Sequence, residues 1–421
     1  MKKDKRRIVI TGMGVVSCFG HDVEKFYDQL LAGVSGVRPI DHFPCEDLPV
    51  RFGAPVQHFN AEDFLDKKQA RRVDSCISYG VAAGKLALQM AQLFTQEERS
   101  CLDKSRAGVI IGSGMGGMQT FVEGVETLKD KGWRRVTPFF VPYILTNMPG
   151  AILSIEMGFQ GPNYSISTAC ATANYSMIAA ANHIRQGHAD VMVCGGVEAS
   201  MNRMCYAGFA AIKAISHRNE DYQRASRPWD ITRDGFVIGE GAGVIVLESL
   251  EHALARGVPI IGEYMGGYVA SDGYHMTEPL PCGTGVAYCM EKAIDDAGIK
   301  KDDINYINAH ATSTPVGDLC EIRAIKKVFS SSIAGKMVNG TKSMIGHALG
   351  AAAGLEIVAT LMAIKRKKVH PTINVSQPES ELEGIDIVLG KAKDLDIRVA
   401  MSNSFGFGGH NSSVLVAPYN G

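Results

Sequence analysis

Two segments in separate parts of the chain each join small residues to an apolar run and a basic end, and they constrain the fold most. They are "TACATANYSMIAAANHIRQGH" at 168–188 and "GHALGAAAGLEIVATLMAIKRKK" at 346–368. Small residues on every side let neighbours pack closely all round, so each segment is predicted to be a central buried helix. Their likeness favours a duplicated α/β unit, with a pseudo-twofold axis relating the two helices.

Short apolar strands alternate with helical patterns along the whole chain, which is typical of the α/β class. Helical spacing of apolar residues is clear at 74–93 and 285–298. Gly12 and Gly14 favour a tight turn after the first strand. The strands are expected within 6–14, 106–114, 189–198, 242–249, 259–270, 304–312, 336–343, 385–390 and 399–409.

The length of 421 residues indicates more than one packed unit. We place the seam between Arg256 and Pro259, which gives an N-terminal half at 1–257 and a C-terminal half at 258–421.

Composition excludes some broad classes of function. Lys plus Arg is 43 against 44 for Asp plus Glu, so there is no overall charge footprint for nucleic acid. No apolar segment approaches the roughly 18 residues that a membrane-spanning helix needs. The ten cysteines include no C-x-x-C pair, so zinc-ribbon and thioredoxin-like sites are unsupported. We expect a cytoplasmic protein with reduced cysteines.

The segment "GSGMGG" at 112–117 fits the dinucleotide-binding pattern G-x-G-x-x-G after a predicted strand. That pattern also needs a second strand ending in an acidic residue about 20 residues later. The chain has a charged helical segment there instead, so we interpret the glycines as a crowded turn and expect no cofactor.

Cys170 lies where the first small-residue helix is predicted to begin. Free N–H groups and the positive end of the helix dipole favour the thiolate, which is the nucleophilic form of cysteine. The alternative is an inert buried thiol, which is the commoner state of a cysteine.

Two histidines follow predicted strands in turn-rich segments: His310 in "NAHATSTPVGD" and His347 in "TKSMIGHALGAAAGLE". Imidazoles directed at a shared pocket can donate hydrogen bonds to a carbonyl group or carry protons. With Cys170 they favour acyl transfer from a thioester. The turn "SNSFGFGG" at 402–409 can bring a backbone N–H close enough to stabilise an oxyanion. Alternatively, the cysteine and the two histidines could bind zinc, but their spacing in the sequence does not support a metal site.

Five motifs together resemble the 3-oxoacyl-[acyl-carrier-protein] synthases of the synthase I/II type, which are elongating condensing enzymes. They occur in order over nearly the whole chain: "TACAT" at 168–172, "SRPWDITRDGFVIGEGAGVIVLE" at 226–248, "NAHATSTP" at 308–315, "GTKSMIGHALGAAAG" at 340–354 and "SNSFGFGGHN" at 402–411. The resemblance implies a thiolase-like fold of two duplicated halves in five layers, αβαβα. It also implies a homodimer that condenses acyl- and malonyl-loaded carrier protein in fatty-acid synthesis.

The resemblance assigns roles to residues. Cys170 would carry the acyl group, and His310 and His347 would stabilise the enolate formed by decarboxylation. Lys342 and Glu356 would support the site. Phe407 would be the acyl gate, and its backbone N–H would stabilise the oxyanion together with that of Cys170. Thr312 and Thr314 would contact the phosphopantetheine arm, and Met115 would form the wall of the acyl pocket. A buried ion pair that only stabilises the fold is the alternative for Lys342 and Glu356.

Carrier proteins of this kind are acidic, so the resemblance implies basic docking residues. The matching positions are Lys68, Arg71, Arg72, Arg134 and Arg135. Such charges mainly speed and orient the encounter. An ordinary solvated surface is the alternative.

The chain departs from the common bacterial pattern at two positions, Ala311 in place of Gly and His410 in place of Thr. Both resemble the plastid-type branch, so chain-length preference is left open. Rival functions are a polyketide-type ketosynthase and a non-catalytic chain-length or scaffold subunit. Non-catalytic subunits of this kind lack the nucleophilic cysteine, so the presence of Cys170 argues against that function. A thiolase would need a second catalytic cysteine.

Overall fold

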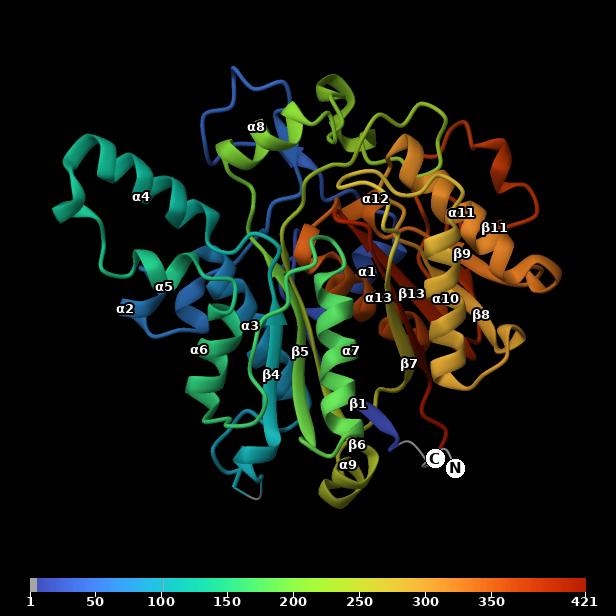
Figure 1. The fold of residues 1–421 in the computed structure, drawn as a ribbon, viewed down its shortest axis with the longest axis horizontal. Coiled ribbons are helices and arrows are strands. Elements are labelled where there is room, and N and C mark those ends of the chain that lie inside the picture. The colour runs from blue at the N-terminus through green and yellow to red at the C-terminus, as the bar shows by residue number, and fades with distance from the viewer. Residues whose placement is uncertain (1–5, 101) are drawn as a thin grey trace.

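A computed structural model describes residues 6–100 and 102–421, so residues 1–5 of the predicted N-terminal half and Cys101 lie outside the described residues. Its centre is a sheet of ten strands in the order β11-β9-β8-β13-β14-β7-β1-β6-β5-β4 (Figure 1). The strands are β1 (Ile8–Val16), β4 (Ala107–Gly112), β5 (Val191–Glu198), β6 (Gly241–Ser249), β7 (Gly262–Ser271), β8 (Ile304–Asn308), β9 (Met337–Asn339), β11 (Asp386–Ile387), β13 (Val399–Gly406) and β14 (His410–Ala417).

The sheet contains the same pattern twice. Outward from β1 the order is β6, β5, β4, and outward from β7 it is β14, β13, β8. In each half the first two pairings are antiparallel and the third is parallel. The predicted duplication is therefore confirmed. A short antiparallel contact of Ile8–Ile10 with Gly262–Tyr264 joins the halves into one sheet.

Helices form three layers around the two halves of the sheet. Helices α7 (Thr172–Arg185) and α13 (Ala352–Arg366) contact each other and strands of both halves. Helices α3 (Ser75–Met90) and α6 (Met148–Met157) cover the outside of the first half, and α10 (Thr284–Ala297) and α11 (Pro315–Phe329) cover the second. Figure 1 shows α7 and α13 between these outer pairs. The result is the five-layer αβαβα arrangement predicted from the sequence.

The inner layer is dense because glycines let backbone touch backbone. A Cβ added to Gly243 on β6 would lie 2.1 Å from the carbonyl carbon of Gly354 on α13. A Cβ added to Gly196 on β5 would lie 2.1 Å from the carbonyl oxygen of Gly350. The small residues of the second segment are thus required by contact with the first half of the sheet.

The prediction of a turn at Gly12 and Gly14 is wrong, because β1 continues through both residues to Val16. A Cβ added to Gly12 would lie 2.0 Å from the carbonyl oxygen of Ala87 in α3, and one added to Gly14 would lie 2.0 Å from that of Ala83. These glycines permit close helix packing rather than a change of chain direction.

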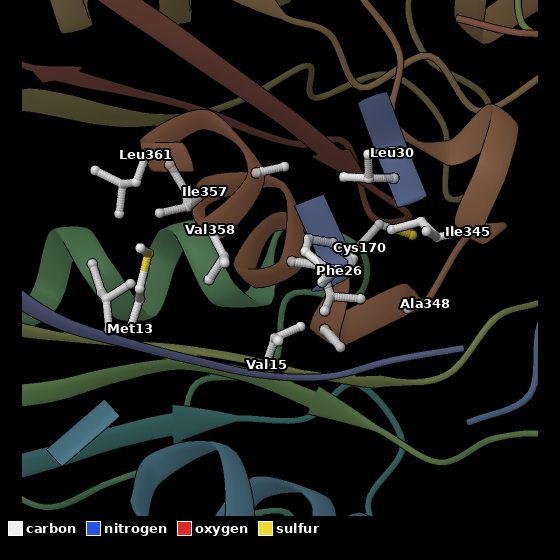
Figure 2. Packing of buried hydrophobic residues seen from close by; sticks show 14 of the residues in the cluster. Met13, Val15, Phe26, Leu30, Cys170, Ile345, Ala348, Ile357, Val358 and Leu361 are labelled. Carbon is white, nitrogen blue, oxygen red and sulfur yellow. The ribbon is translucent and has the colours of Figure 1, made fainter. Parts of the chain in front are cut away.

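The hydrophobic core extends from the inner layer to the nucleophile candidate. Figure 2 shows Cys170 with Phe26, Leu30 and Ile345 in the buried cluster that also holds Val15 of β1 and Val358 of α13. Cys170 is only 8% exposed. A thiol in this place is surrounded by apolar side chains and packed helices.

One pair of helices stands away from these layers. Helices α4 (Met118–Lys131) and α5 (Phe140–Ile144), with the 3-10 turn η3 (Trp133–Arg135), contain no buried residue. Figure 1 shows α4 extending from the body of the molecule, and we name residues 118–145 the arm.

Shorter elements connect the layers. They are α1 (Val23–Leu31), α2 (Lys67–Ala70), α8 (Arg203–Ala211), α9 (Leu250–Arg256), α12 (Lys342–Ile345), the 3-10 turn η7 (Leu349–Ala351), β2 (Arg38–Pro39), β3 (Phe52–Gly53), β10 (Lys368–Val369) and β12 (Lys393–Asp394). The seam predicted between residues 257 and 258 falls in the connection from α9 to β7, and it stays a prediction. None of the described helices is long and apolar enough to cross a membrane.

We predict that Gly354→Ala destabilises the protein by about 1–3 kcal/mol or more, because the added Cβ would lie 2.3 Å from the carbonyl oxygen of Gly243. Gly208→Ala in α8 is the matched control, since no atom lies within 4 Å of its added Cβ. The control should stabilise by up to about 1 kcal/mol through helix propensity. Denaturant unfolding measures both, and equal effects would contradict the packing argument.

Candidate active site

Cys170 lies in the tight turn that leads into α7. The preceding residue, Ala169, has φ 49°, and the Oγ1 of Thr172 accepts a hydrogen bond from the N–H of Thr168 at 2.9 Å. Ser404 Oγ, from β13 of the other half, donates to the carbonyl oxygen of Cys170 at 2.8 Å. The nucleophile candidate is therefore held by both halves of the molecule.

The Cys170 thiol is close to one imidazole. Its Sγ lies 3.0 Å from Nε2 of His347, which can accept the thiol proton. Burial raises the pKa of Cys170 to about 12, and the charge of Lys342 opposes this. The helix end was expected to favour the thiolate, but in the resting site the apolar surroundings outweigh that effect and the group is a thiol. The anion forms only as the proton moves to a partner.

His310 is held by a buried network of charges. Lys342 Nζ donates to the carbonyl oxygen of His310 at 2.7 Å and lies 3.3 Å from its Nδ1. The same Nζ donates to Glu356 Oε1 at 2.6 Å, and both side chains of this ion pair are at most 1% exposed. An ammonium group has no acceptor, so Nδ1 of His310 accepts and its Nε2 carries the proton of the neutral ring. His310 therefore presents an N–H donor.

The two imidazoles face one another. The ring centroids of His310 and His347 are 5.4 Å apart and the planes meet at 86°. Phe405 packs edge-on against His310 and Phe236 against His347. Burial, and then the charge of Lys342, lower the pKa of both histidines well below the ordinary value. Both rings are neutral at neutral pH, so they can act as N–H donors rather than as cations.

Strained backbone occurs beside each of the three residues. Besides Ala169 before Cys170, Ala311 after His310 has φ 41° and Leu349, two residues after His347, has φ 46°. Left-handed conformations cost a non-glycine residue about 1–2 kcal/mol, and such strain is often found at functional sites. Ala311, one of the two departures noted above, therefore occupies a position that favours glycine. His410, the other departure, packs edge-on against Tyr175 of α7.

The three residues line one cavity of about 480 Å³. Thr312, Thr314, Met115 and Phe407, predicted to contact substrate, line the same cavity. The two threonine hydroxyls are 2.9 Å apart. Lys342 and Glu356 are not in the cavity lining; Lys342 contacts His310 and Glu356 contacts Lys342. Across the described residues, no group of three or more His, Cys, Asp or Glu side chains is arranged to hold a metal ion.

Sequence reasoning missed several buried polar residues around the cavity. Glu321 of α11 accepts hydrogen bonds from the N–H groups of His310 and Ala311, both at 2.9 Å, and burial raises its pKa to about 7. Glu198, at the end of β5, lines the cavity and accepts four hydrogen bonds. The only signal was a single acidic residue after an apolar strand or on a helix face, which is too weak to indicate a site.

The predicted docking residues all lie on the surface, outside the cavity lining. Arg72, after α2, lies over the ring of Phe139 at the start of α5, which links the first basic group to the arm. Arg134 and Arg135 are in η3 of the arm. Among the described residues that line the cavity, Lys213 is the one Lys or Arg, and the sequence did not single it out.

A buried thiol beside two neutral imidazoles in a cavity is the arrangement of an acyl-transferring condensing site. Comparison with known proteins agrees. Residues 5–253 match the family model "Beta-ketoacyl synthase, N-terminal domain", and residues 261–376 match "Beta-ketoacyl synthase, C-terminal domain". The chain belongs to the beta-ketoacyl synthase family.

Individual relatives cover nearly the whole chain. A 3-oxoacyl-[acyl-carrier-protein] synthase I, chloroplastic, of Arabidopsis thaliana is 54% identical over 99% of this chain and 87% of its own length. Synthase 2 of Vibrio cholerae is 46% identical over 98% of this chain and 99% of its own. A crystal structure of a beta-ketoacyl synthase from Burkholderia phymatum superposes with a TM-score of 0.90 at 33% identity, covering 99% of this chain and 100% of that one.

A solved complex shows the same fold in another pathway class. It contains a type II polyketide ketosynthase with its acyl-carrier protein, and that ketosynthase covers 99% of this chain and 100% of its own, with a TM-score of 0.90 at 31% identity.

We predict that the buried histidines make folding stability depend on pH. When the pH is below about 6.5, the ordinary pKa of histidine, the unfolded chain binds a proton at each histidine. The native rings, with lowered pKa values, do not. Stability is therefore lost as the pH falls below 6.5, by up to about 1.4 kcal/mol per pH unit for each ring. The measurement is unfolding free energy at several pH values for the intact protein and for His347→Asn. The variant should show a shallower slope, and the exposed His217→Asn serves as control. Parallel slopes for all three proteins would contradict a neutral buried His347.

Proposed function

We propose that the protein is a 3-oxoacyl-[acyl-carrier-protein] synthase, which lengthens an acyl group by two carbons in fatty-acid synthesis. The single observation that carries this is the 3.0 Å contact between Cys170 Sγ and His347 Nε2, in a cavity that also presents His310. The near full-length relatives with that name support the substrate class.

In the first step, the Cys170 sulfur attacks the thioester carbonyl of an acyl-carrier. His347 Nε2 takes the thiol proton and returns it to the departing carrier thiol. The oxyanion that forms is stabilised by the backbone N–H groups of Cys170 and Phe407. The end of β13, next to Phe407, contacts the turn that holds Cys170, since a Cβ added to Gly406 would lie 3.1 Å from the nitrogen of Cys170. The product is an acyl-thioester on Cys170.

Acylation removes the thiol proton that faced His347, and the neutral ring then takes the tautomer with its hydrogen on Nε2. In the second step, the thioester carbonyl of a malonyl-carrier accepts hydrogen bonds from Nε2–H of His310 and His347. Cleavage of the bond to the carboxylate releases carbon dioxide and leaves an enolate, which these donors stabilise. The enolate carbon attacks the acyl-Cys170 carbonyl, and the Cys170 sulfur leaves. Lys342 lies 3.3 Å from Nδ1 of His310 and keeps that nitrogen unprotonated, which leaves the hydrogen of the neutral ring on Nε2.

We propose a homodimer because the arm leaves apolar side chains uncovered. Val125 is 48% exposed, Leu128 52%, Trp133 72% and Val141 61%. A helix pair with no buried residue needs a partner surface for these side chains. A second copy of the chain is the occupant we propose.

We propose a cytoplasmic location. The nine described cysteines are all free, which supports a reducing compartment. Relatives named chloroplastic make the plastid interior the alternative.

We predict that Cys170→Ala abolishes elongation because no acyl-thioester can form. Intact-protein mass spectrometry should show an acyl adduct on the unchanged protein and on Cys289→Ala, a buried-thiol control, but not on Cys170→Ala. The double change His310→Ala, His347→Ala should retain some acyl uptake. Its release of carbon dioxide from malonyl-carrier should fall by about 10²–10³-fold or more. An unchanged protein that takes no acyl group and releases no carbon dioxide would favour the non-catalytic subunit.

We propose that Lys68, Arg71, Arg72, Arg134 and Arg135 dock an acidic carrier protein. We predict that Arg71→Glu with Arg72→Glu raises KM for acyl-carrier about tenfold at low salt and leaves kcat nearly unchanged, because these charges act on encounter. The difference should shrink as salt screens the charges. Reversal of the exposed Lys391 is the control. A rise in KM that is independent of salt would argue against electrostatic docking.

A further inference from the structure

Glu198 is a buried carboxylate whose partners are all neutral hydrogen-bond donors. It is fully buried at the end of β5 and lines the cavity. Ser113 Oγ donates to Oε1 at 2.9 Å and the N–H of Met115 at 3.1 Å. The N–H groups of Gly114 and Gly350 donate to Oε2, both at 3.0 Å. No described Lys, Arg or His forms an ion pair with it.

These donors belong to two segments that the chain order keeps far apart. Residues 113–115 follow β4 in the first half and carry Met115, which lines the cavity. Gly350 is in η7 of the second half, three residues after His347. A single oxygen atom, Oε2 of Glu198, therefore bonds the loop of the cavity wall to the turn of the histidine.

The contact of residues 113–115 with Gly350 at Glu198, which we name the junction, has no room for an added methyl group. A Cβ added to Gly114 would lie 2.7 Å from Oε2 of Glu198. One added to Gly350 would lie 2.8 Å from the same oxygen and 2.6 Å from the nitrogen of Gly114. Because the two segments touch each other and share an acceptor, neither can shift without moving the other.

From this geometry we infer that Glu198 is a positioning residue that fixes the Met115 wall relative to Cys170 and His347, and so sets which acyl lengths reach the thiol. Glu198 acts through these residues and does not itself react. The inference rests on the proposed acyl transfer. The carboxylate is suited to the role because it accepts at both oxygens, and all four partners donate.

Glu198→Gln is the sharpest variant. The amide nitrogen of glutamine cannot accept a hydrogen bond from the N–H groups that now donate to that position. At least one of the two segments, residues 113–115 or the turn at Gly350, must therefore move. Ser113→Ala is the milder comparison variant. It leaves the bonds from Gly114, Met115 and Gly350 to Glu198 and removes the donor to Oε1 together with the acceptor of the Gly116 N–H at 2.9 Å.

The experiment measures kcat/KM for acylation of Cys170 over a series of short to long saturated acyl-carriers. We expect Glu198→Gln to change the ratio of long to short substrates by about tenfold or more, the scale of a methylene-sized change in a pocket. Ser113→Ala should change it much less. A fall that is uniform over all lengths would show a purely structural role and overturn the inference.

A double-variant cycle with Met115→Ala makes the test specific. Once the side chain of the wall is removed, Glu198→Gln should shift the length profile little further, so the two effects should not add. Full additivity would overturn the inference. If Glu198→Gln does not fold, Gly350→Ala tests the junction from the other half, and it too should shift the profile. If the unchanged protein takes no acyl group, the proposed function fails instead.

Discussion

The packing of α7 against α13 between the two halves of the sheet is the constraint on which the site depends. Cys170 lies just before α7 and His347 just before η7 and α13. The pseudo-twofold brings the beginnings of these helices together, and this gives the 3.0 Å contact between thiol and imidazole. Glycine contacts such as Gly243 with Gly354 set how closely the helices approach the strands. A change in that spacing alters the chemistry directly.

The surroundings of the site are dry, and this decides the protonation state of its residues. Burial keeps the Cys170 thiol protonated and both histidines neutral. The one cation in the network, Lys342, forms an ion pair with Glu356 and also contacts Nδ1 of His310. Burying such a pair costs about as much desolvation free energy as its attraction returns, so we attribute the pair to control of His310 rather than to stability.

Much of this could be predicted from the sequence. The strands, the two central helices and the gathering of Cys170, His310 and His347 followed from periodicity, small-residue patterns and the resemblance to condensing enzymes. Gly12 and Gly14 were misinterpreted, because a glycine that permits close packing looks like one that permits a turn. Strand β14 was missed, since it begins with polar residues at His410–Ser413. The state of the Cys170 thiol could not be predicted, because it depends on residues brought around it from distant segments.

The backbone conformations of Ala169, Ala311 and Leu349 have a consequence for the order in which the structure comes apart. Each turn is held in the left-handed region by contacts from elsewhere, so it regains free energy as soon as those contacts loosen. The sheet and the central helices have no such internal opposition. Local opening of the three turns therefore costs less free energy than global unfolding. Under mild denaturation the reactivity of the Cys170 thiol will decrease while the sheet and the helices remain folded.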